Sequence, residues 1–218
     1  MEPITLVIGN RNYSSWSLRA WLTLRKSGLP HEERRLSLFA PSFDAAIGAF
    51  SPSGKVPAIV VNGHSIWDSL AVCEYLNELA GGKLWPADAK ARAHARSISA
   101  EMHSGFETLR ARMPMNCRAQ RRRVAIDDAL THDIERIQSI WSDAKIQYGG
   151  QGRWLYGAFS IADAFYAPVV SRFQTYGVQV DQLARDYMDW VLADSDLQQW
   201  YQASQEEPEV LEEEEVGR

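Results

Sequence analysis

The chain has 218 residues, and its 45% hydrophobic and 23% charged composition is that of an ordinary globular protein, which excludes collagen-like, disulfide-scaffolded and wholly disordered chains. No apolar run reaches about eighteen residues, and no basic stretch precedes an apolar core at the N-terminus, so we expect neither a membrane span nor a signal peptide. The only cysteines, Cys73 and Cys117, lack metal-ligand spacing. Free thiols in a reducing compartment, the cytoplasm, are therefore expected.

The net charge of -5 comes from the C-terminal end of the chain. Residues 206–218 contain seven Glu and one Arg, whereas residues 1–205 balance 22 basic against 21 acidic residues. A nearly neutral body argues against a nucleic-acid-binding protein. The tail repels itself and has no aromatic residue, so residues 206–218 are predicted to be solvated and disordered.

Residues 1–80 alternate short apolar, β-branched runs with amphipathic stretches. Asn62-Gly63, between two extended runs, indicates a hairpin because both residues tolerate the positive φ of a type I′ turn. The order βαβαββα gives a mixed sheet with helices on its faces, so an α/β domain of thioredoxin-like arrangement is predicted over 1–80. The predicted elements are strands at 4–8, 32–38, 58–61 and 64–67 and helices at 16–27, 41–50 and 68–79.

Strand signals end at a linker over 81–87, which contains Gly81, Gly82 and Pro86. An all-helical domain is predicted over 88–205. Ser160 and Asp163 have the spacing of a capping box that opens a helix, in which the aspartate carboxylate returns to the serine N–H. The predicted helices span 87–113, ended by Pro114, then 117–148, a third from 160, and finally 181–193 and 196–204.

Four motifs, in this order, resemble those of the cytosolic glutathione transferase superfamily. Residues 13–19, YSSWSLR, are similar to the serine motif of zeta- and tau-like classes, and residues 51–57, SPSGKVP, look like the loop that leads to the family's cis-proline. Asp68-Ser69 matches an acidic-serine pair, although the family more often has Glu, and residues 160–163 match the capping box of its helical domain. The resemblance covers nearly the whole body and implies glutathione as co-substrate and a homodimer.

The resemblance assigns the catalytic role to Ser14, which precedes Arg19 by the family's spacing, with Ser15 as the close alternative. A free thiol has a pKa near about 8.5, and the thiolate is the nucleophile. A helix N-terminus presents unsatisfied N–H groups and positive potential, and a hydroxyl there can donate to the sulfur and favour its charged form. Both serines are also ordinary helix caps.

The resemblance also implies a site for the rest of glutathione. The backbone N–H and C=O of Val56, before a cis Pro57, would pair with the cysteinyl part as an added strand does. Asp68 would pair with the γ-glutamyl ammonium, and the Ser69 hydroxyl and N–H would hold its carboxylate. Lys55 would meet a ligand carboxylate, or would be a solvated surface lysine.

The second substrate, a small hydrophobic electrophile, is expected against the helix that ends at Pro114. Its apolar members would form an adaptable wall and its basic members would tolerate a polar or anionic substrate. The same spacing fits an amphipathic helix that packs into the core. The predicted substrate-binding residues are Tyr13, His103, Phe106, Arg110 and Met113.

These features predict a cytoplasmic glutathione transferase of detoxification type. One alternative is a glutathione-dependent cis-trans isomerase of the maleylacetoacetate type, against which Trp16 replaces the cysteine common in that motif. The other is a non-catalytic, partner-binding protein of the same fold, for which intact glutathione motifs would be unnecessary. The basic cluster at 118–123 lacks interleaved aromatic residues, and no histidine has metal-ligand spacing, so neither nucleic acid nor metal is expected as a partner.

Overall fold

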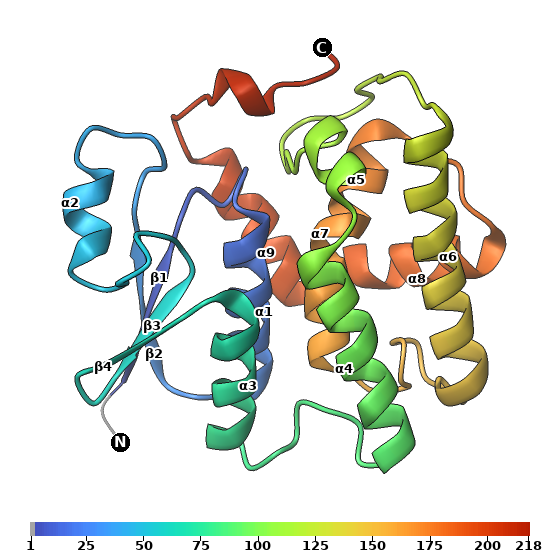
Figure 1. Cartoon of the computed structure of the whole chain (residues 1–218), viewed down its shortest axis with the longest axis horizontal. Coiled ribbons are helices and arrows are strands. Elements are labelled where there is room, and N and C mark those ends of the chain that lie inside the picture. Colours follow the sequence, from blue (N-terminus) through green and yellow to red (C-terminus); the bar gives the residue numbers. More distant parts are fainter. Residues whose placement is uncertain (1–2) are drawn as a thin grey trace.

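A computed structural model describes residues 3–218 of the chain. In this part every strand precedes Ser69, and the elements that follow are helical (Figure 1). The order βαβαββα predicted for the first part is confirmed. Its elements are β1 (Ile4–Ile8), α1 (Ser15–Ser27), β2 (His31–Arg35), α2 (Phe43–Gly48), β3 (Ala58–Val61), β4 (His64–Trp67) and α3 (Ser69–Leu79).

The four strands form one mixed sheet in the order β2-β1-β3-β4. β1 pairs parallel with β2 and antiparallel with β3, and the β3-β4 hairpin turns at Asn62-Gly63, both with positive φ. Since side chains alternate along a strand, Leu6 and Ile8 join the core beneath α1 and α3, whereas Val7 packs with Ile47 of α2 on the other face. The thioredoxin-like arrangement therefore places the start of α1 and the start of α3 at the same side of the sheet (Figure 1).

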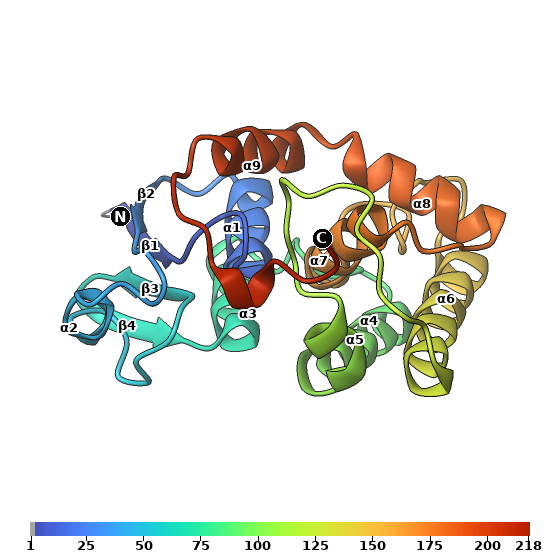
Figure 2. The same ribbon diagram turned by 90° about the horizontal axis from the view of Figure 1, so that it is seen from above.

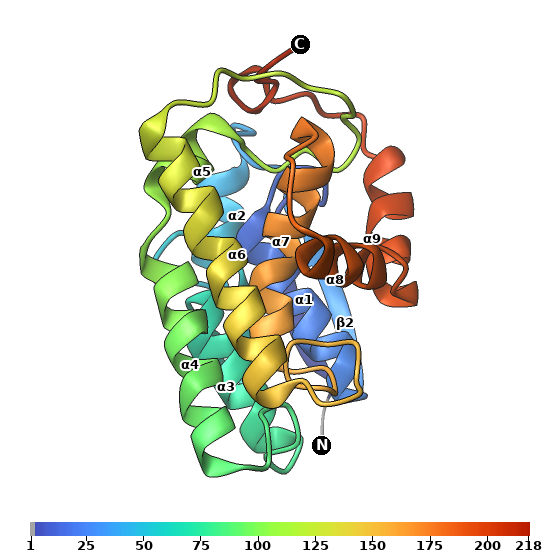
Figure 3. The same ribbon diagram turned by 90° about the vertical axis from the view of Figure 1, so that its right-hand side faces the viewer.

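The second part of the chain is all-helical, as predicted. Its central helix, α7, is buried along almost its whole length and packs against α1, α4 and α8 (Figure 3). A helix that is apolar all round has no solvent face and belongs in the middle of a bundle. The helices are α4 (Ala89–Ser104), α5 (Glu107–Arg112), α6 (Asp128–Tyr148), α7 (Ile161–Tyr176), α8 (Gln182–Leu192) and α9 (Ser195–Gln205), followed by a 3-10 turn at Glu212–Glu214.

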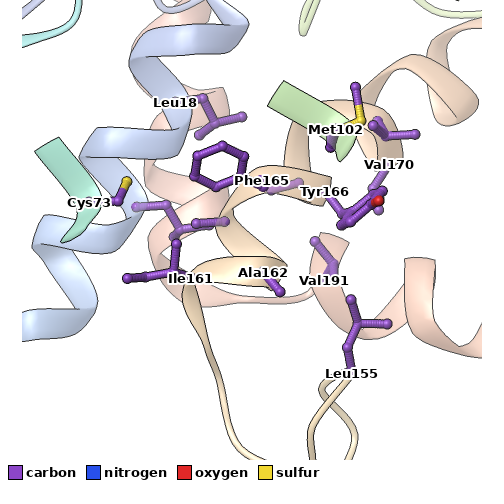
Figure 4. Close-up of a cluster of buried hydrophobic side chains, with 14 of the residues drawn as sticks. Leu18, Cys73, Met102, Leu155, Ile161, Ala162, Phe165, Tyr166, Val170 and Val191 are labelled. Carbon is purple, nitrogen blue, oxygen red and sulfur yellow. The ribbon is translucent and has the colours of Figure 1, made fainter. Parts of the chain in front are cut away.

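One continuous hydrophobic core joins the two parts. Figure 4 shows Phe165 of α7 between Leu18 of α1 and the helices of the bundle, with Cys73 of α3 nearby. These side chains are fully buried or nearly so. The sheet part and the helical part are thus held together by apolar burial along α1 and α7, which is the seam beside which the candidate site lies.

The capping box predicted at the start of α7 is present. The carboxylate of Asp163 accepts hydrogen bonds from the Ser160 N–H at 2.8 Å and the Leu155 N–H at 3.1 Å, and the Tyr187 hydroxyl donates to it at 3.1 Å. Burial raises the pKa of Asp163 to about 6, although these donors favour the charged form. The carboxylate therefore ties α7 to the preceding loop and to α8.

The helix predicted over 87–113 is broken in the structure. α4 ends at Ser104 and α5 begins at Glu107, with Phe106 between them in the left-handed conformation at φ 59°. The guanidinium of Arg110 donates to the carbonyls of Met102, His103 and Gly105, which satisfies the last turn of α4 without continuing the helix. The break turns the residues after 105 away from the face that the continuous periodicity predicts.

The helix predicted over 117–148 begins only at Asp128, where Asp127 caps it. Residues 117–127 are irregular and form hydrogen bonds with distant segments. The Cys117 N–H donates to the Asn12 carbonyl at 3.2 Å, and the Arg123 N–H donates to the Gly217 carbonyl at 3.0 Å. Long-range partners of this kind replace the helical hydrogen bonds that the local pattern favours.

The prediction of a disordered tail is wrong in this structure. Residues 206–218, which we call the acidic strap, run from α9 across the start of α1 to the loop before α6 (Figure 2). Leu211 and Glu207 of the strap are buried. The charge repulsion expected within the strap is offset because its carboxylates meet arginines from other segments, including Arg35 and Arg122.

Candidate active site

Most of the predicted site residues line two adjoining cavities at the seam between the sheet part and the helical part. The first, of about 450 Å³, lies at the start of α1 under the acidic strap, and we call it the strap cavity. The second, of about 430 Å³, lies at the start of α3, and we call it the Ser69 cavity. Trp16, Lys55 and Val56 line both. Because they share this wall, the two cavities form one continuous cleft, which can hold an elongated molecule.

The first turn of α1 brings Ser14 into the strap cavity. As N-cap, its Oγ accepts a hydrogen bond from the Ser17 N–H at 3.3 Å, and its hydroxyl donates to Ser17 Oγ at 2.8 Å. The Ser17 hydroxyl also accepts from the Gly9 N–H at 3.0 Å. A hydroxyl chain is thus fixed at the positive end of the α1 dipole.

Ser15 lines the same cavity and is joined to the helical part. Its Oγ accepts a hydrogen bond from Nη2 of Arg172 at 3.3 Å. Arg172 is only 4% exposed, its Nε donates to the Met113 carbonyl at 2.8 Å, and its Nη1 has no hydrogen-bond partner in residues 3–218. Burial, together with Arg110, lowers the pKa of Arg172 to about 10, so it remains a cation at neutral pH.

Arg19, one turn further along α1, is a second buried cation near the site. Its guanidinium lies 4.3 Å from the ring centroid of Trp16 and 4.7 Å from that of Phe165. Within the described chain its Nε and Nη1 have no hydrogen-bond partner. Burial lowers the pKa of Arg19 to about 9, with Arg172 adding to the effect. The cation is held by aromatic faces rather than by a carboxylate.

The loop before β3 supplies the wall shared by the two cavities. The Val56–Pro57 peptide bond is cis, as predicted. In the part of the chain that the structure describes, the N–H and C=O of Val56 make no hydrogen bond to other protein groups. Lys55 lies at the same wall without a salt bridge to a described carboxylate. A free backbone donor and acceptor can pair with the backbone of a peptide ligand.

The start of α3 forms the Ser69 cavity. Asp68 caps this helix through Oδ1, which accepts from the Leu70 N–H at 2.8 Å, while its Oδ2 lies 3.3 Å from Nε2 of His103. The Ser69 hydroxyl is buried and has no hydrogen-bond partner in residues 3–218. A buried polar group without a partner is costly, so this hydroxyl is an expected contact for a ligand.

Of the five residues predicted to bind the second substrate, the structure brings two into the strap cavity, Tyr13 and Arg110. Phe106 and Met113 are buried in the core instead, because the chain breaks at Gly105 and shifts the phase of the residues that follow. His103 packs edge-to-face on Trp16 at 5.3 Å and faces Asp68. Burial lowers the pKa of His103, although Asp68 opposes this.

Sequence reasoning missed two charged residues of the strap cavity, Arg172 and Glu214. A lone arginine within the apolar sequence of α7 was a usable signal, because such a charge is rarely buried without a role. Glu214 belongs to the strap, whose composition pointed to solvent. The missed uncharged lining residues are Leu38, Phe39, Phe43, Gly54 and Pro114 in the strap cavity and Ser53 and Trp67 in the Ser69 cavity.

Outside the cleft, the described chain has neither a reactive thiol nor a metal-binding cluster. Burial raises the pKa values of Cys73 and Cys117 to about 12, which keeps both thiols protonated. Among residues 3–218 no group of three or more His, Cys, Asp or Glu side chains is arranged to hold a metal ion. Within the same range no helix combines the length and apolarity that crossing a membrane requires.

The family to which the chain belongs follows from two sequence profiles. The profile described as "Glutathione S-transferase, N-terminal domain" matches residues 13–79, and "Glutathione S-transferase, C-terminal domain" matches residues 89–203, more than half of the chain. The chain therefore belongs to the glutathione S-transferase family, as the four motifs predict.

Curated relatives carry the name of one enzyme of this family. A probable maleylacetoacetate isomerase of Caenorhabditis elegans is 36% identical over 100 residues, which are 45% of this chain and 46% of that protein. Maleylacetoacetate isomerase of Rattus norvegicus is 27% identical over 176 residues, 78% of each chain. The chain thus matches under half of the first relative and most of the second.

A solved structure shows the same fold. It is a glutathione transferase homologue from Burkholderia strain BGR1 with bound glutathione, and it superposes with a TM-score of 0.71 at 24% identity over 94% of this chain and 100% of that one. At this identity the match shows the two-part architecture and not the chemistry.

Proposed function

We propose that this chain is a glutathione transferase that holds glutathione in the cleft and delivers its thiolate to a small electrophile in the strap cavity. The observation that carries the proposal is the meeting of the Ser14 and Ser15 hydroxyls with Val56 at one cavity. Family membership and the bound glutathione of the Burkholderia homologue support it.

The residues of the Ser69 cavity fit the chemistry of glutathione. The buried, unpartnered hydroxyl of Ser69 and the start of α3 suit a carboxylate, and the half-exposed carboxylate of Asp68 suits an ammonium. The γ-glutamyl end of the tripeptide carries both groups. The free backbone of Val56 then suits the cysteinyl amide, which directs the sulfur toward the first turn of α1.

Three features of α1 would favour the thiolate over the thiol. The helix dipole places positive potential at its first turn, a serine hydroxyl donates a hydrogen bond to the sulfur, and the buried Arg19 and Arg172 add fixed charge. Neither serine acts as a base, because a hydroxyl is far too weak an acid to be ionised at neutral pH. The thiolate then forms a carbon–sulfur bond with the electrophile as the leaving group departs or the double bond is saturated.

Ser14 remains the proposed donor, with Ser15 as the alternative. Hydroxyl protons rotate, so Ser17 can donate to Ser14 and leave the Ser14 proton free for the sulfur. Ser15 accepts from Arg172, and its own proton has no acceptor in residues 3–218. Both hydroxyls can therefore reach an anion, and substitution separates them.

A glutathione-dependent cis-trans isomerase is the second candidate, because the curated relatives bear the name maleylacetoacetate isomerase. The same thiolate would add to an activated double bond, allow rotation about the resulting single bond and leave again. The non-catalytic alternative is disfavoured by the open cleft and the unpartnered Ser69 hydroxyl. The homodimer and the cytoplasmic location stay predictions.

Turnover of chlorodinitrobenzene by the purified protein tests the proposal. Ser14→Ala is expected to lower kcat/KM by about a hundredfold, the effect of removing one donor to a developing or resting anion. Ser27→Ala, at the far end of α1 where the hydroxyl bonds the Leu24 carbonyl, is the matched control and should leave the rate unchanged. Unchanged rates in both Ser14→Ala and Ser15→Ala would contradict the proposed role of the first turn.

A further inference from the structure

The acidic strap is anchored on both sides of the cleft. On the sheet side, Glu207 accepts from the Arg11 N–H at 2.7 Å and the Asn12 N–H at 3.2 Å, and Glu209 pairs with Arg35 at 2.8 Å. Both glutamates precede Leu211 in the chain. The first half of the strap is therefore held against the sheet part, ahead of the residue that lines the cavity, Glu214.

Glu215 anchors the strap to the loop before α6 and also to Tyr13 of the sheet part. Its Oε1 accepts from the Tyr13 hydroxyl and from Asn116 Nδ2, each at 2.8 Å, and its Oε2 pairs with Arg122. Arg118 of the same loop donates to the Glu209 carbonyl at 2.7 Å. The basic cluster at 118–123, which no nucleic acid is needed to explain, thus binds the strap.

Between these anchors, Glu214 stands at the wall of the strap cavity. In residues 3–218 its carboxylate forms no salt bridge within 4.0 Å and no hydrogen bond. Burial raises its pKa, while Arg172 favours its charged form. Glu214 is therefore a carboxylate held in place by its neighbours along the chain rather than by a partner of its own.

Arg172 lies in the same cavity wall with its Nη1 unpartnered, and Arg110 adds a second guanidinium whose Nε is unpartnered in the described chain. A guanidinium group with a buried N–H that has no acceptor attracts an anion. The carboxylate that the fold itself presents to this cavity is that of Glu214. Any anionic substituent of a second substrate would have to share the cavity with it.

We propose that Glu214 is a specificity-determining residue, and that the strap presents its carboxylate in the strap cavity to select neutral over anionic electrophiles. This inference rests on the proposed function, since it concerns the second substrate of the same cleft. Like charges placed together in a site of low dielectric repel, so an anionic group near Arg172 is disfavoured while Glu214 is charged. Removing that charge leaves the two guanidinium groups to attract the anion.

The test uses two electrophiles that differ by one carboxylate, chlorodinitrobenzene and chlorodinitrobenzoate. Glu214→Gln keeps the size of the side chain and removes its charge, and it is expected to raise the ratio of kcat/KM for the benzoate to that for the neutral compound by about tenfold. Glu213→Gln is the matched control, because Glu213 is exposed in the same turn and does not line the cavity. It should leave the ratio unchanged.

Calorimetric binding of the benzoate without glutathione gives a second readout. Glu214→Gln is expected to tighten this binding by about tenfold relative to Glu213→Gln. If glutathione does not bind, the proposed function fails, yet this titration still tests Glu214. Equal benzoate affinity in the two variants, or an unchanged kcat/KM ratio in an active enzyme, would overturn the inference.

Discussion

The two walls of the cleft are built in different ways. The wall proposed for glutathione comes from the starts of α1 and α3 and the loop before β3, all within the sheet part, where each group lies beside a cap or turn that its own sequence specifies. The opposite wall combines α7 with the acidic strap, and the Ser15–Arg172 hydrogen bond that joins the two walls spans 157 positions of sequence. Residues close together in the sequence specify the structure of the first wall, whereas the second wall depends on contacts between residues far apart in the sequence.

In our proposal the first wall recognises glutathione, which is the same in every reaction, and the second wall selects the electrophile, which can vary. Substitutions in the first wall should change glutathione affinity and leave the choice of electrophile alone, whereas substitutions in the second wall should do the reverse. Substitutions in the shared scaffold should lower the free energy of unfolding. At temperatures where the chain is still folded, they should leave glutathione affinity and the choice of electrophile unchanged.

The largest expected effect is on the scaffold. Asp163→Ala removes the acceptor of the Ser160 and Leu155 N–H groups and of the Tyr187 hydroxyl, and we expect it to lower the free energy of unfolding by about 3 kcal/mol, as for a buried hydrogen-bond network. Chemical denaturation measures this. Asp181→Ala, which removes an exposed cap of α8, is the control and should cost about 1 kcal/mol. Equal losses in the two variants would contradict the special role of Asp163.

The pH dependence of stability sharpens this prediction. Since burial raises the pKa of Asp163 to about 6 from its ordinary 3.8, the folded state binds the proton more tightly than the unfolded state does. The contribution of Asp163 to stability is therefore greatest below pH 3.8 and declines as the pH rises to about 6. The difference in unfolding free energy between wild type and Asp163→Asn, measured across this window, should change in that sense, and a flat difference would refute the assignment.

The next largest effect concerns the glutathione wall. Asp68→Asn keeps a helix cap but removes the charge proposed to meet the γ-glutamyl ammonium, so glutathione affinity should fall by about 2 kcal/mol, roughly thirtyfold in Kd. Calorimetry gives the Kd directly. The ratio of rates for the benzoate and the neutral electrophile should stay the same. A change in that ratio larger than the change in Kd would contradict the claim that the first wall controls glutathione affinity and not the choice of electrophile.

A smaller loss is expected for Ser69→Ala. The hydroxyl has no partner within the described chain, so its removal should not destabilise the fold, but it should weaken glutathione binding by about 1.4 kcal/mol, or tenfold. Ser99→Ala is a suitable comparison, because the Ser99 hydroxyl is also buried but bonds the Ala95 carbonyl away from the cleft. If Ser69→Ala lowers the free energy of unfolding but leaves the Kd for glutathione unchanged, the Ser69 hydroxyl stabilises the fold and does not bind the ligand.

The smallest effect belongs to the attachment of the strap. Arg35 and Ser37 hold the pKa of Glu209 down to about 2, against the opposing effect of burial. This carboxylate therefore stabilises the fold above its ordinary pKa of 4.5 and loses that contribution as the pH falls toward 2. Because the pair is near the surface, Glu209→Gln should cost under about 1 kcal/mol. An unfolding free energy that falls more steeply with acid in the variant than in wild type would contradict this.

The caps and turns of the wall proposed for glutathione could be predicted because their sequence signals are local. Ser14 and Asp68 are caps that read directly from residue type and position, Asn62-Gly63 specifies the hairpin, and the cis bond at Val56-Pro57 follows from the motif. The resulting fold, a mixed sheet followed by a helical bundle, needed no long-range information.

The sequence could not predict the opposite wall because tertiary contacts override local pattern there. Apolar periodicity continues through Gly105, yet the Arg110 guanidinium satisfies the carbonyls that end α4. The strap has the composition of a disordered tail, and it folds because arginines of three distant segments, β2, the loop before α6 and α7, offset the charge of its carboxylates. Composition reports what a segment contains and not which charges will surround it.

The most direct test of the account is the pKa of the glutathione sulfur in the complex, measured by thiolate absorbance in the ultraviolet as the pH is varied. We expect it to lie at least about one unit below the free value of about 8.5, and to return toward that value in Ser14→Ala but not in Ser27→Ala. A bound thiol that titrates as free glutathione does, in wild type and variants alike, would contradict the claim that the first turn of α1 makes the sulfur a nucleophile.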